Sequence, residues 1–271
     1  MKKFKDIDQV EGMTRADFFD LYFDQEPVVM VNMISDWPAV KEWSPDYFKR
    51  KYGQEEVCIH HHDPNNKTHM ESFLKNEMQD MTLAEYVDSL SSMGGAHALR
   101  EEYEIFEMLP GLINDVNYFE PFSRKEGCMV DGFYKALWFG PKGYETGMHA
   151  DHGHQLLFHI HGHKRILFFA PDQTEYLYEE KAETSELYES MTEDIATFYS
   201  DSVRWAAVNG LRPDYKTYPL FEQAQYYEGS LEPGHVLYLP HYWWHTVESK
   251  DVSIGISTEL DDENFLKFIP S

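Results

Sequence analysis

The C-terminal half of the chain is a series of short apolar runs separated by glycine and proline, and this pattern constrains the fold most strongly. From about residue 135 the runs are rich in β-branched and aromatic residues and cover residues 136–139, 155–160, 165–170, 235–239 and 252–257. Turn residues stand between them, at Gly140-Pro141, Gly162 and Pro233-Gly234. Repeated short strands with such turns are typical of all-β sandwiches and barrels. We therefore predict a mainly β protein whose core is a jelly-roll barrel over residues 135–260.

The first 134 residues carry a different pattern, in which helical and extended segments alternate. Thr14 is a suitable N-cap for a helix over residues 14–23. A second helix is marked at both ends, by Ser44-Pro45 at its start and by Gly53 at its end. Two segments are predicted to be strands, residues 27–34 and 57–62. We expect an N-terminal α/β segment in front of the barrel.

An acidic stretch interrupts the predicted barrel at about residues 175–210. Its length marks it as an insertion between strands, and residues 192–199 favour a helix within it. Insertions on a rigid barrel often carry specificity. The chain has no internal repeat, low-complexity tract or Gly/Ser linker, so we expect residues 1–271 to form a single domain.

Composition limits the class of protein further. Of the 271 residues, 42% are hydrophobic and 15% are aromatic, which suits a sizeable β-rich core. No run approaches the roughly 18 apolar residues of a membrane span, and the sequence MKKFKDIDQVEGMTR lacks the apolar segment of a signal peptide. Cys58 and Cys128 are the only cysteines, so a disulfide scaffold is not expected. We predict a cytoplasmic protein with no membrane partner.

The net charge of −25 is strongly acidic. Such a surface repels nucleic-acid phosphates, whose binding needs clustered lysine and arginine. A local basic groove would still be compatible with this average, and acidity also keeps a protein soluble. The charge therefore argues against a nucleic-acid partner and favours a protein or peptide substrate.

Two short stretches offer the ligands of a metal ion. The first is Thr146-Gly-Met-His149-Ala-Asp151 and the second is Pro240-His-Tyr-Trp-Trp-His245. Residues i and i+2 of a strand point to the same side, so His149 and Asp151 can reach one ion, and His245 would come from another strand. Two imidazoles and one carboxylate bind non-haem Fe(II) on one face and leave the other positions open.

Chance and surface exposure are competing explanations for this motif. The chain has 14 histidines, six of them between His149 and His163, so a His-x-Asp triplet can arise without function. His61-His62-Asp63 is a similar triplet in the N-terminal segment, and we interpret it as solvated because no downstream partner follows it. For Lys164, 13 residues after Asp151, an exposed turn is the common fate, whereas a buried lysine would need a counter-anion.

A specific resemblance accompanies these motifs. The stretches ETGMHADHGHQLLFHIHGHKRILFFAPD and EPGHVLYLPHYWWHTVES resemble the JmjC-type 2-oxoglutarate oxygenases, which have a cupin barrel, also called a double-stranded β-helix. The similarity is strongest to the small hydroxylase branch that includes the asparaginyl hydroxylase inhibiting hypoxia-inducible factor. It covers about residues 135–260, with a weaker similarity near Pro27, Trp37-Pro38 and Gly53.

The resemblance implies both cofactors and residue roles. His149, Asp151 and His245 would bind Fe(II), and 2-oxoglutarate and O2 would be the co-substrates. Thr146 and Lys164 match the positions that hold the distal carboxylate of 2-oxoglutarate, and Gln155 stands where relatives often carry asparagine. Trp243 and Trp244 are predicted to pack in the barrel wall.

The chain also departs from the family pattern. Relatives usually carry a tyrosine that helps to bind 2-oxoglutarate at the position of Ala98, and Tyr103 is the nearest replacement in sequence. The Pro-Gly-Asp turn of the family is Pro233-Gly234-His235 here, and Ser257 replaces an asparagine of some members. These differences bear on the co-substrate pocket, and none removes an iron ligand.

Three functions follow from the resemblance. The leading hypothesis is a dioxygenase that hydroxylates a C–H bond on a protein side chain. A hydroxylase of a tRNA base or small molecule is the second, and the net charge argues against tRNA. The third is a metal-binding cupin without catalysis. Lysine demethylation is a weaker enzymatic variant, because the sequence reveals no methyl-ammonium pocket.

Overall fold

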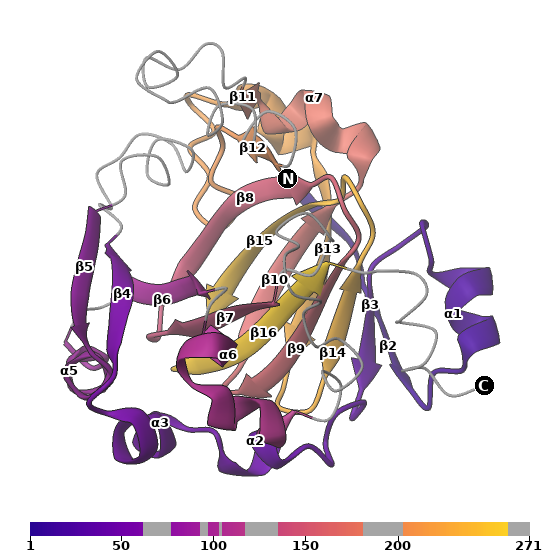
Figure 1. The fold of residues 1–271 in the computed structure, drawn as a ribbon. Helices are drawn as coiled ribbons and strands as arrows, with labels where there is room; N and C mark the ends of the chain where they lie inside the picture. The colour runs from indigo at the N-terminus through magenta and orange to yellow at the C-terminus, as the bar shows by residue number, and fades with distance from the viewer. Residues whose placement is uncertain (62–76, 93–96, 103–104, 117–134, 181–202, 260–271) are drawn as a thin grey trace.

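The computed structural model describes residues 1–61, 77–92, 97–102, 105–116, 135–180 and 203–259 (Figure 1). The helices are α1 (Arg15–Leu21), α2 (Pro38–Glu42), α3 (Pro45–Tyr52), α5 (Leu83–Ser89), α6 (Ile105–Met108) and α7 (Thr174–Leu177), with 3-10 turns η2 (Pro110–Asp115), η4 (Pro171–Gln173) and η7 (Pro219–Gln223). The strands are β1 (Lys2–Asp6), β2 (Asp8–Glu11), β3 (Val28–Val31), β4 (Glu56–His61), β5 (Glu77–Thr82), β6 (His97–Glu102), β7 (Lys135–Gly140), β8 (Glu145–Asp151), β9 (Gln155–His161), β10 (Lys164–Phe169), β11 (Glu179–Glu180), β12 (Val203–Ala206), β13 (Gln225–Leu231), β14 (Val236–Leu239), β15 (Trp244–Ser249) and β16 (Ser253–Glu259).

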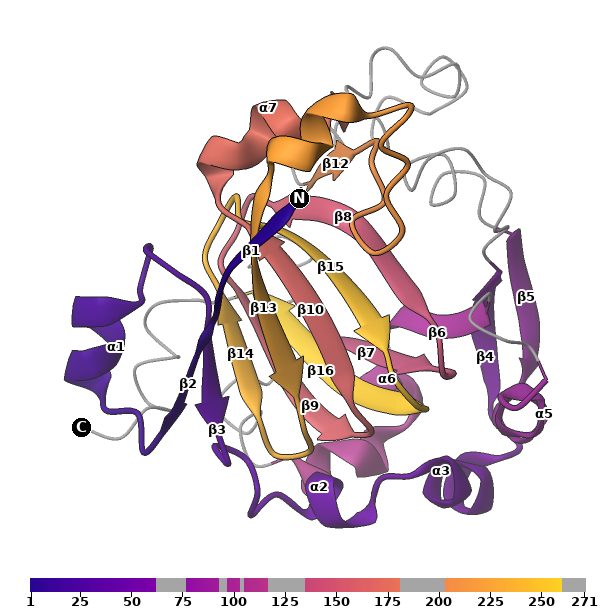
Figure 2. The same ribbon diagram turned by 180° about the vertical axis from the view of Figure 1, so that it is seen from behind.

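These strands form two sheets. The order in one is β1-β13-β10-β15-β8-β12-β11, and the order in the other is β2-β3-β14-β9-β16-β7-β6-β4-β5. The two sheets lie one behind the other when the molecule is viewed from opposite sides (Figures 1 and 2). Both sheets are mixed, because β1 pairs with β13 and β2 with β3 in parallel while the other pairs are antiparallel. Strands from distant parts of the sequence therefore lie next to each other, as the metal-ligand hypothesis requires.

The inner faces of the two sheets share an apolar layer. Ile166, Phe168 and Val247 contribute from the seven-stranded sheet, and Leu237 and Leu239 contribute from the nine-stranded sheet. Because side chains alternate along a strand, the residues two positions away from these also point inward. This alternation fixes which polar side chains face the space between the sheets.

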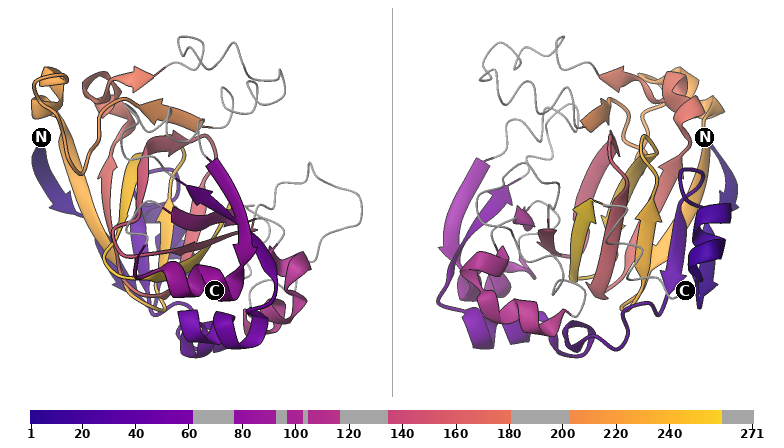
Figure 3. Two further views of the ribbon diagram at one scale, coloured as in Figure 1. Left: turned by 90° about the vertical axis from the view of Figure 1, so that its left-hand side faces the viewer. Right: turned by 45° about the vertical axis from the view of Figure 1, so that its right-hand side comes forward.

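Helices cover parts of the outer faces of the two sheets. Side chains of α2, α3 and α5, such as Ala39, Phe48 and Tyr86, belong to the cluster that covers the nine-stranded sheet. Leu177 of α7 and Phe221 of η7 belong to the cluster on the outside of the seven-stranded sheet. Helices α2, α3, α5 and α6 lie at the end of the sheets opposite α7, whereas α1 lies at the side next to β2 and β3 (Figures 1 and 3). On the seven-stranded sheet this cover is partial, because the ion-paired side chains of Arg165, Glu228 and Glu248 on its outer face are 35%, 23% and 24% exposed.

Local sequence signals explain the helix boundaries. The Thr14 hydroxyl accepts a hydrogen bond from the Asp17 amide and caps α1. Ser44 caps α3 in the same way through the Tyr47 amide, and Pro45 occupies the first position of that helix. Both predicted helices are thus confirmed within two residues of their expected ends.

The mainly β prediction with helical additions is confirmed, and the strand order is consistent with the cupin fold. Strand pairing among the described residues does not join the two sheets into a closed barrel. The hydrogen-bonded strands therefore form two sheets that pack against each other.

The predicted helix over residues 192–199 lies outside the described residues. The described edges of the predicted insertion form α7, β11 and β12 instead. Within the described residues, no helix has the length and apolar character needed to cross a membrane.

Candidate metal centre

Strands β8 and β15 bring the three predicted metal ligands together. His245 on β15 pairs directly with His149 on β8, so both imidazoles rise from the same side of the sheet. The alternating residues Met148 and Ala150 are buried in the cluster on the outer face. His149 and Asp151 therefore face inward together. Burial of their neighbours on the opposite face holds this orientation, because a slip of one residue would expose Met148.

The ligand atoms of these three residues lie close to one another. All of them fall within 4.8 Å of each other, with Asp151 3.9 Å from His149 Nε2 and 3.8 Å from His245 Nε2. Adjacent ligands at about 2.1 Å from an ion would be about 3 Å apart, so small side-chain rotations would complete the coordination. The side chains are 12%, 20% and 10% exposed for His149, Asp151 and His245, so the site remains open on one side.

Backbone carbonyls set the orientation of both imidazoles. His149 Nδ1 lies 2.7 Å from the Gly147 carbonyl oxygen, and His245 Nδ1 lies 3.2 Å from the Trp243 carbonyl oxygen. A carbonyl can only accept, so each Nδ1 carries a hydrogen, and in the neutral imidazole Nε2 then has a free lone pair. Metal-bound histidines are held in this way by their second nitrogen. The tautomers that the backbone selects are those that a metal ion needs.

Burial makes the site electrostatically receptive to a cation. It raises the pKa of Asp151 above the usual value for aspartate, and the nearby histidines His149 and His152 offset only part of this effect. Burial also lowers the pKa of His245 well below the usual value, so this imidazole is neutral at pH 7. A divalent cation would compensate the negative charge of the buried carboxylate. The donor set therefore fits Fe(II), Zn(II) or a similar ion.

Lys164 is the first residue of β10 and points into the same inner layer. It pairs with Ser249 of β15 and Leu231 of β13, on the face that carries Ile166 two residues later. The residue is only 6% exposed, and its ammonium group has no ion pair or hydrogen bond with another described residue. Burial lowers the pKa of Lys164 to about 8. A buried ammonium without a counter-anion leaves room for an anionic ligand.

Thr146 faces inward because of an irregularity between β8 and β15. Val247 pairs with Thr146, whereas His245 pairs with His149, so one more residue lies on β8 than on β15 between these pairs. This bulge allows Thr146 and His149, three positions apart, to share one face. Thr146 and Lys164 lie on opposite sides of β15, two strand spacings or about 10 Å apart. A dicarboxylate bound at the metal could reach between them.

Gln155 begins β9 and lies on the inner face of the other sheet. It pairs with Leu239 of β14 and Glu259 of β16. Leu157, two residues later, packs against the inner apolar cluster and confirms the direction of this face. The structure therefore places Gln155 on the sheet opposite the predicted iron ligands, facing the same interior.

Two of the residues that depart from the family pattern, Ala98 and Ser257, can be located in the structure. Ala98 on β6 is buried, and Tyr103 lies outside the described residues. Ser257 faces inward on β16, where its hydroxyl accepts a hydrogen bond of 2.7 Å from Trp138 Nε1. Trp243 and Trp244 are buried in the apolar clusters on the two faces of the seven-stranded sheet, as predicted.

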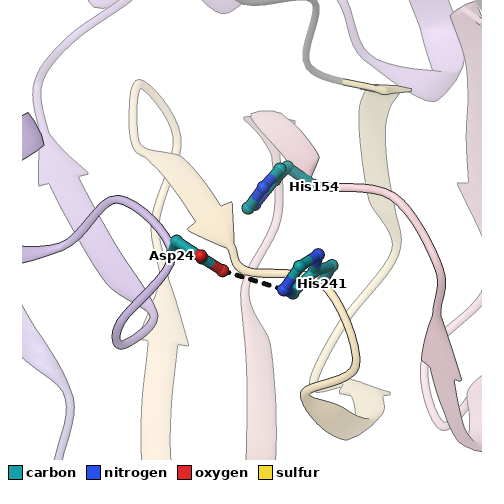
Figure 4. A group of neighbouring side chains, drawn as sticks. All are labelled: Asp24, His154 and His241. Carbon is teal, nitrogen blue, oxygen red and sulfur yellow. Dashed lines mark ion pairs between the residues drawn. The ribbon is translucent and has the colours of Figure 1, made fainter.

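A second group of possible ligands was not predicted. Asp24, His154 and His241 lie together near the end of β8 and β14, and Asp24 Oδ1 is 2.8 Å from His241 Nε2 (Figure 4). The rings of His154 and His241 are stacked, with centroids 4.8 Å apart and planes inclined by 12°. A metal ion lies in the plane of each imidazole that binds it, so nearly parallel rings do not converge on one ion. Of the two groups among the described residues, the group of His149 has the better geometry.

Three further polar residues at the interior had escaped the sequence prediction. Trp205 on β12 stacks on His149, with centroids 5.2 Å apart. His159 on β9 is fully buried, and Glu259 on β16 is half-buried beside Asp151. No local motif distinguishes these residues. Only strand pairing with β8, β9 and β16 brings them to the interior.

Comparison with known proteins identifies the family. The model of the family described as "Cupin-like domain" matches residues 15–258, and the chain therefore belongs to this family. Among its relatives is Jumonji C domain-containing protein 5 of Drosophila melanogaster, 26% identical over 254 residues that cover 93% of this chain and 59% of the relative. Human HSPB1-associated protein 1 is 27% identical over 258 residues, 90% of this chain and 50% of the relative.

A third relative carries an enzymatic name. The human bifunctional peptidase and (3S)-lysyl hydroxylase JMJD7 is 26% identical over 252 residues, which cover 89% of this chain and 79% of the relative. The chain spans between half and three-fifths of the length of the first two relatives. All three similarities run along nearly the whole of this chain, in agreement with a family match that includes both the N-terminal segment and the sheets.

Proposed function

We propose that this protein is an Fe(II)- and 2-oxoglutarate-dependent dioxygenase that hydroxylates a C–H bond on a protein side chain. One observation carries the proposal: two imidazoles and one carboxylate converge on the inner face of the sheet that also carries a buried, unpaired lysine, Lys164. The ligand set suits non-haem iron with open positions. The lysine suits an anionic co-substrate in the same interior. A metal-binding cupin without catalysis would have no use for that lysine.

The residues of this chain would bind and orient, and the bound iron and 2-oxoglutarate would supply the oxidising chemistry. His149, Asp151 and His245 would hold the ion. The Gly147 and Trp243 carbonyls fix the two imidazoles by accepting hydrogen bonds from Nδ1. Trp205 stacks on His149 and shields one side of the site from water. No side chain is required to act as a general acid or base.

The co-substrate would lie between the metal site and Lys164. The ammonium of Lys164 would pair with the distal carboxylate, and the Thr146 hydroxyl would donate a hydrogen bond to it. Gln155 would approach from the facing sheet. A bound dianion would compensate the positive charge of the buried Lys164 ammonium. This compensation would explain why a lysine lies in the apolar layer.

A protein substrate is favoured by three observations. The relative JMJD7 is named a lysyl hydroxylase, and a relative from Xenopus tropicalis is named lysine-specific demethylase 8. The resemblance to the asparaginyl hydroxylase branch points to side-chain hydroxylation as well. The net charge of −25 disfavours a tRNA substrate.

The test is succinate formation from 2-oxoglutarate in the presence of Fe(II) and O2. We expect slow turnover without any protein substrate, and its loss in His149→Ala. His241→Ala is the matched control, because this histidine belongs to the second group of side chains, and its turnover should equal that of the wild type. Calorimetry that finds no 2-oxoglutarate binding to the metal-loaded protein would overturn the proposal.

A further inference from the structure

His159 is a fully buried histidine of β9 that the proposed function does not use. Burial lowers the pKa of this imidazole to about 3, so at pH 7 it is neutral and carries one hydrogen. Its Nε2 donates that hydrogen to the Gly162 carbonyl oxygen at 2.7 Å, which leaves a lone pair on Nδ1. Nδ1 is buried and has no hydrogen-bond partner among the described residues. Because a buried acceptor without a donor is costly, we expect a donor for this atom.

The Nδ1 atom of His159 faces the interior between the two sheets. His159 pairs with Gly255 of β16, and a Cβ atom at that glycine would lie 3.8 Å from Nδ1. The same Cβ atom would lie 3.4 Å from Leu157 Cδ1, and Leu157 packs against the inner apolar cluster. Gly255 therefore lies beside Nδ1 on the inner face and places no side chain in front of this acceptor.

The buried ammonium of Lys164 lies at the same end of the interior. The carbonyl that accepts from the His159 ring belongs to the turn directly before Lys164. Lys164 pairs with Ser249 of β15 and Leu231 of β13, neither of which carries a charge. The Ser249 hydroxyl lies 2.9 Å from the hydroxyl of Ser253, the first residue of the strand that pairs with β9. The two sheets therefore meet here, with His159 on one and Lys164 on the other.

Two other imidazoles also act on His159, and each is hydrogen-bonded elsewhere. His163 Nδ1 lies 2.6 Å from Asp251 Oδ2, on an exposed turn. His235 Nδ1 accepts a hydrogen bond of 3.3 Å from a backbone amide of the turn after β13. Among the described groups whose charge acts on His159, Lys164 is therefore the one with unpaired donors.

We infer that His159 positions Lys164: its Nδ1 accepts one hydrogen bond from the ammonium and directs the remaining N–H groups toward the distal carboxylate of the co-substrate. The inference rests on the proposed function, because it adds a positioning residue to the same pocket. An ammonium has three donors and no acceptor, and in an apolar layer each unpaired N–H is costly. The lone pair of His159 satisfies one of them without adding a negative charge that would repel a dicarboxylate.

Two amide variants separate the two nitrogens of His159. Asparagine places its oxygen near the position of Nδ1, so His159→Asn keeps the acceptor for Lys164 and loses the donor to the Gly162 carbonyl. Glutamine places its amide nitrogen near the position of Nε2, so His159→Gln keeps that donor and loses the acceptor. A structural role through Gly162 and a positioning role through Lys164 therefore predict opposite rankings of the two variants.

The first measurement is the protonation of Lys164 without any ligand. Carbon-13 NMR of the lysine Cε atoms follows it, and the signal that is absent in Lys164→Arg belongs to this residue. An acceptor stabilises the charged ammonium, so losing it should lower the titration midpoint of Lys164 in His159→Gln by about one pH unit or more. In His159→Asn the midpoint should stay within about half a pH unit of the wild type.

The second measurement is calorimetry of 2-oxoglutarate binding to the Mn(II)-loaded protein. At pH 6.5 Lys164 is charged in every variant, so His159→Gln should bind within about threefold of the wild type. At pH 9 it should bind about tenfold more weakly, because its Lys164 has lost more of its charge. Pyruvate, a 2-oxo acid without a distal carboxylate, should bind equally to both proteins. In a Lys164→Met background, His159→Gln should cause no further loss.

Three results would overturn the inference. A Lys164 midpoint that His159→Gln leaves unchanged would do so, and so would an equal loss of 2-oxoglutarate affinity in the Lys164→Met background. A larger effect of His159→Asn than of His159→Gln would assign the histidine to the Gly162 carbonyl instead. Failure of the proposed function gives a different result: the Mn(II)-loaded wild type would not bind 2-oxoglutarate, while a lower Lys164 midpoint in His159→Gln would still support the contact between the two residues.

Discussion

His149 of β8 and His245 of β15 lie directly opposite each other, with ring centroids 4.1 Å apart. Their pairing depends on the register of two strands whose sequences are far apart. Asp151 shares the face of His149 because it is two residues further along the same strand. The candidate metal centre is therefore a property of one strand pair, and its three proposed ligands can be tested individually.

Asp151→Asn should weaken metal binding strongly. The substitution keeps the shape of the side chain but removes its negative charge, which is the main attraction for a divalent cation in this buried site. We expect a loss greater than the roughly 10–100-fold that removing an outer hydrogen-bond partner of a metal ligand causes. Competition with a chromophoric chelator measures the affinity for Co(II) or Fe(II).

The control for this prediction is Asp24→Asn. Asp24 belongs to the second group, in which the imidazoles are stacked and do not converge. Its substitution should leave metal affinity unchanged. A large loss in Asp24→Asn, with Asp151→Asn unaffected, would show that the ion binds at the second group.

The affinity for 2-oxoglutarate should depend on pH through Lys164. Burial lowers the pKa of Lys164 to about 8, so the free protein loses this positive charge as the pH rises through that value. We expect affinity to be constant below about pH 7 and to fall by up to about tenfold for each pH unit above 8. Calorimetry with Mn(II)-loaded protein from pH 6.5 to 9.5, in steps of about half a unit, measures this.

Two variants check that Lys164 is the source. Lys164→Met should weaken 2-oxoglutarate binding by at least about 30-fold, the equivalent of about 2 kcal/mol for losing one partner of a buried charge pair. Lys164→Arg should bind more weakly than the wild type but without the fall above pH 8, because a guanidinium stays charged. A wild-type affinity that is flat up to pH 9.5 would contradict this role.

Sequence signals predicted those parts of the molecule that local chemistry determines. Thr14 and Ser44 marked helix starts because a hydroxyl next to free backbone amides is a local feature. His149 and Asp151 were recognisable because strand alternation places residues i and i+2 together. The resemblance to a known family added Lys164 and Thr146, whose inward direction the structure shows.

Other features were not predictable because they depend on strand pairing. β1 has the polar sequence KKFKD and becomes a strand by pairing in parallel with β13, more than 200 residues later. Glu259 and His159 face the interior only because β16 pairs with β9. Trp205 reaches His149 through the pairing of β12 with β8. Nothing in the sequence near these residues specifies their partners.

Gly162→Ala should destabilise the protein more than Gly143→Ala does. Both glycines have positive φ angles, 77° and 81°, which cost an alanine about 1–2 kcal/mol. A Cβ atom at Gly162 would also lie 2.1 Å from the Val252 carbonyl oxygen, whereas Gly143 has open space. Relieving that overlap should add about 1–3 kcal/mol to the loss. Urea unfolding measures the two free energies, and equal losses would contradict the clash.

His159 should make the stability of the fold sensitive to acid. This imidazole is fully buried, and its Nε2 donates a hydrogen bond of 2.7 Å to the Gly162 carbonyl oxygen. Burial, and then the charge of Lys164, lowers the pKa of His159 to about 3. The unfolded chain binds a proton at about pH 6.5. Between these values the unfolded state holds more protons, so stability falls as the pH falls, by about 1.4 kcal/mol per pH unit from this residue.

His159→Gln separates this effect from the titration of other groups. Glutamine keeps a donor for the Gly162 carbonyl oxygen and does not titrate, so the variant should lose stability less steeply than the wild type between pH 6.5 and 4.5. Near pH 7 it should be less stable by about 1 kcal/mol, because the packing around a buried ring is lost. This difference should shrink and then reverse as the pH falls. Urea unfolding at pH 7, 6 and 5 measures it, and parallel curves for the two proteins would show that His159 is protonated equally in the folded and unfolded states.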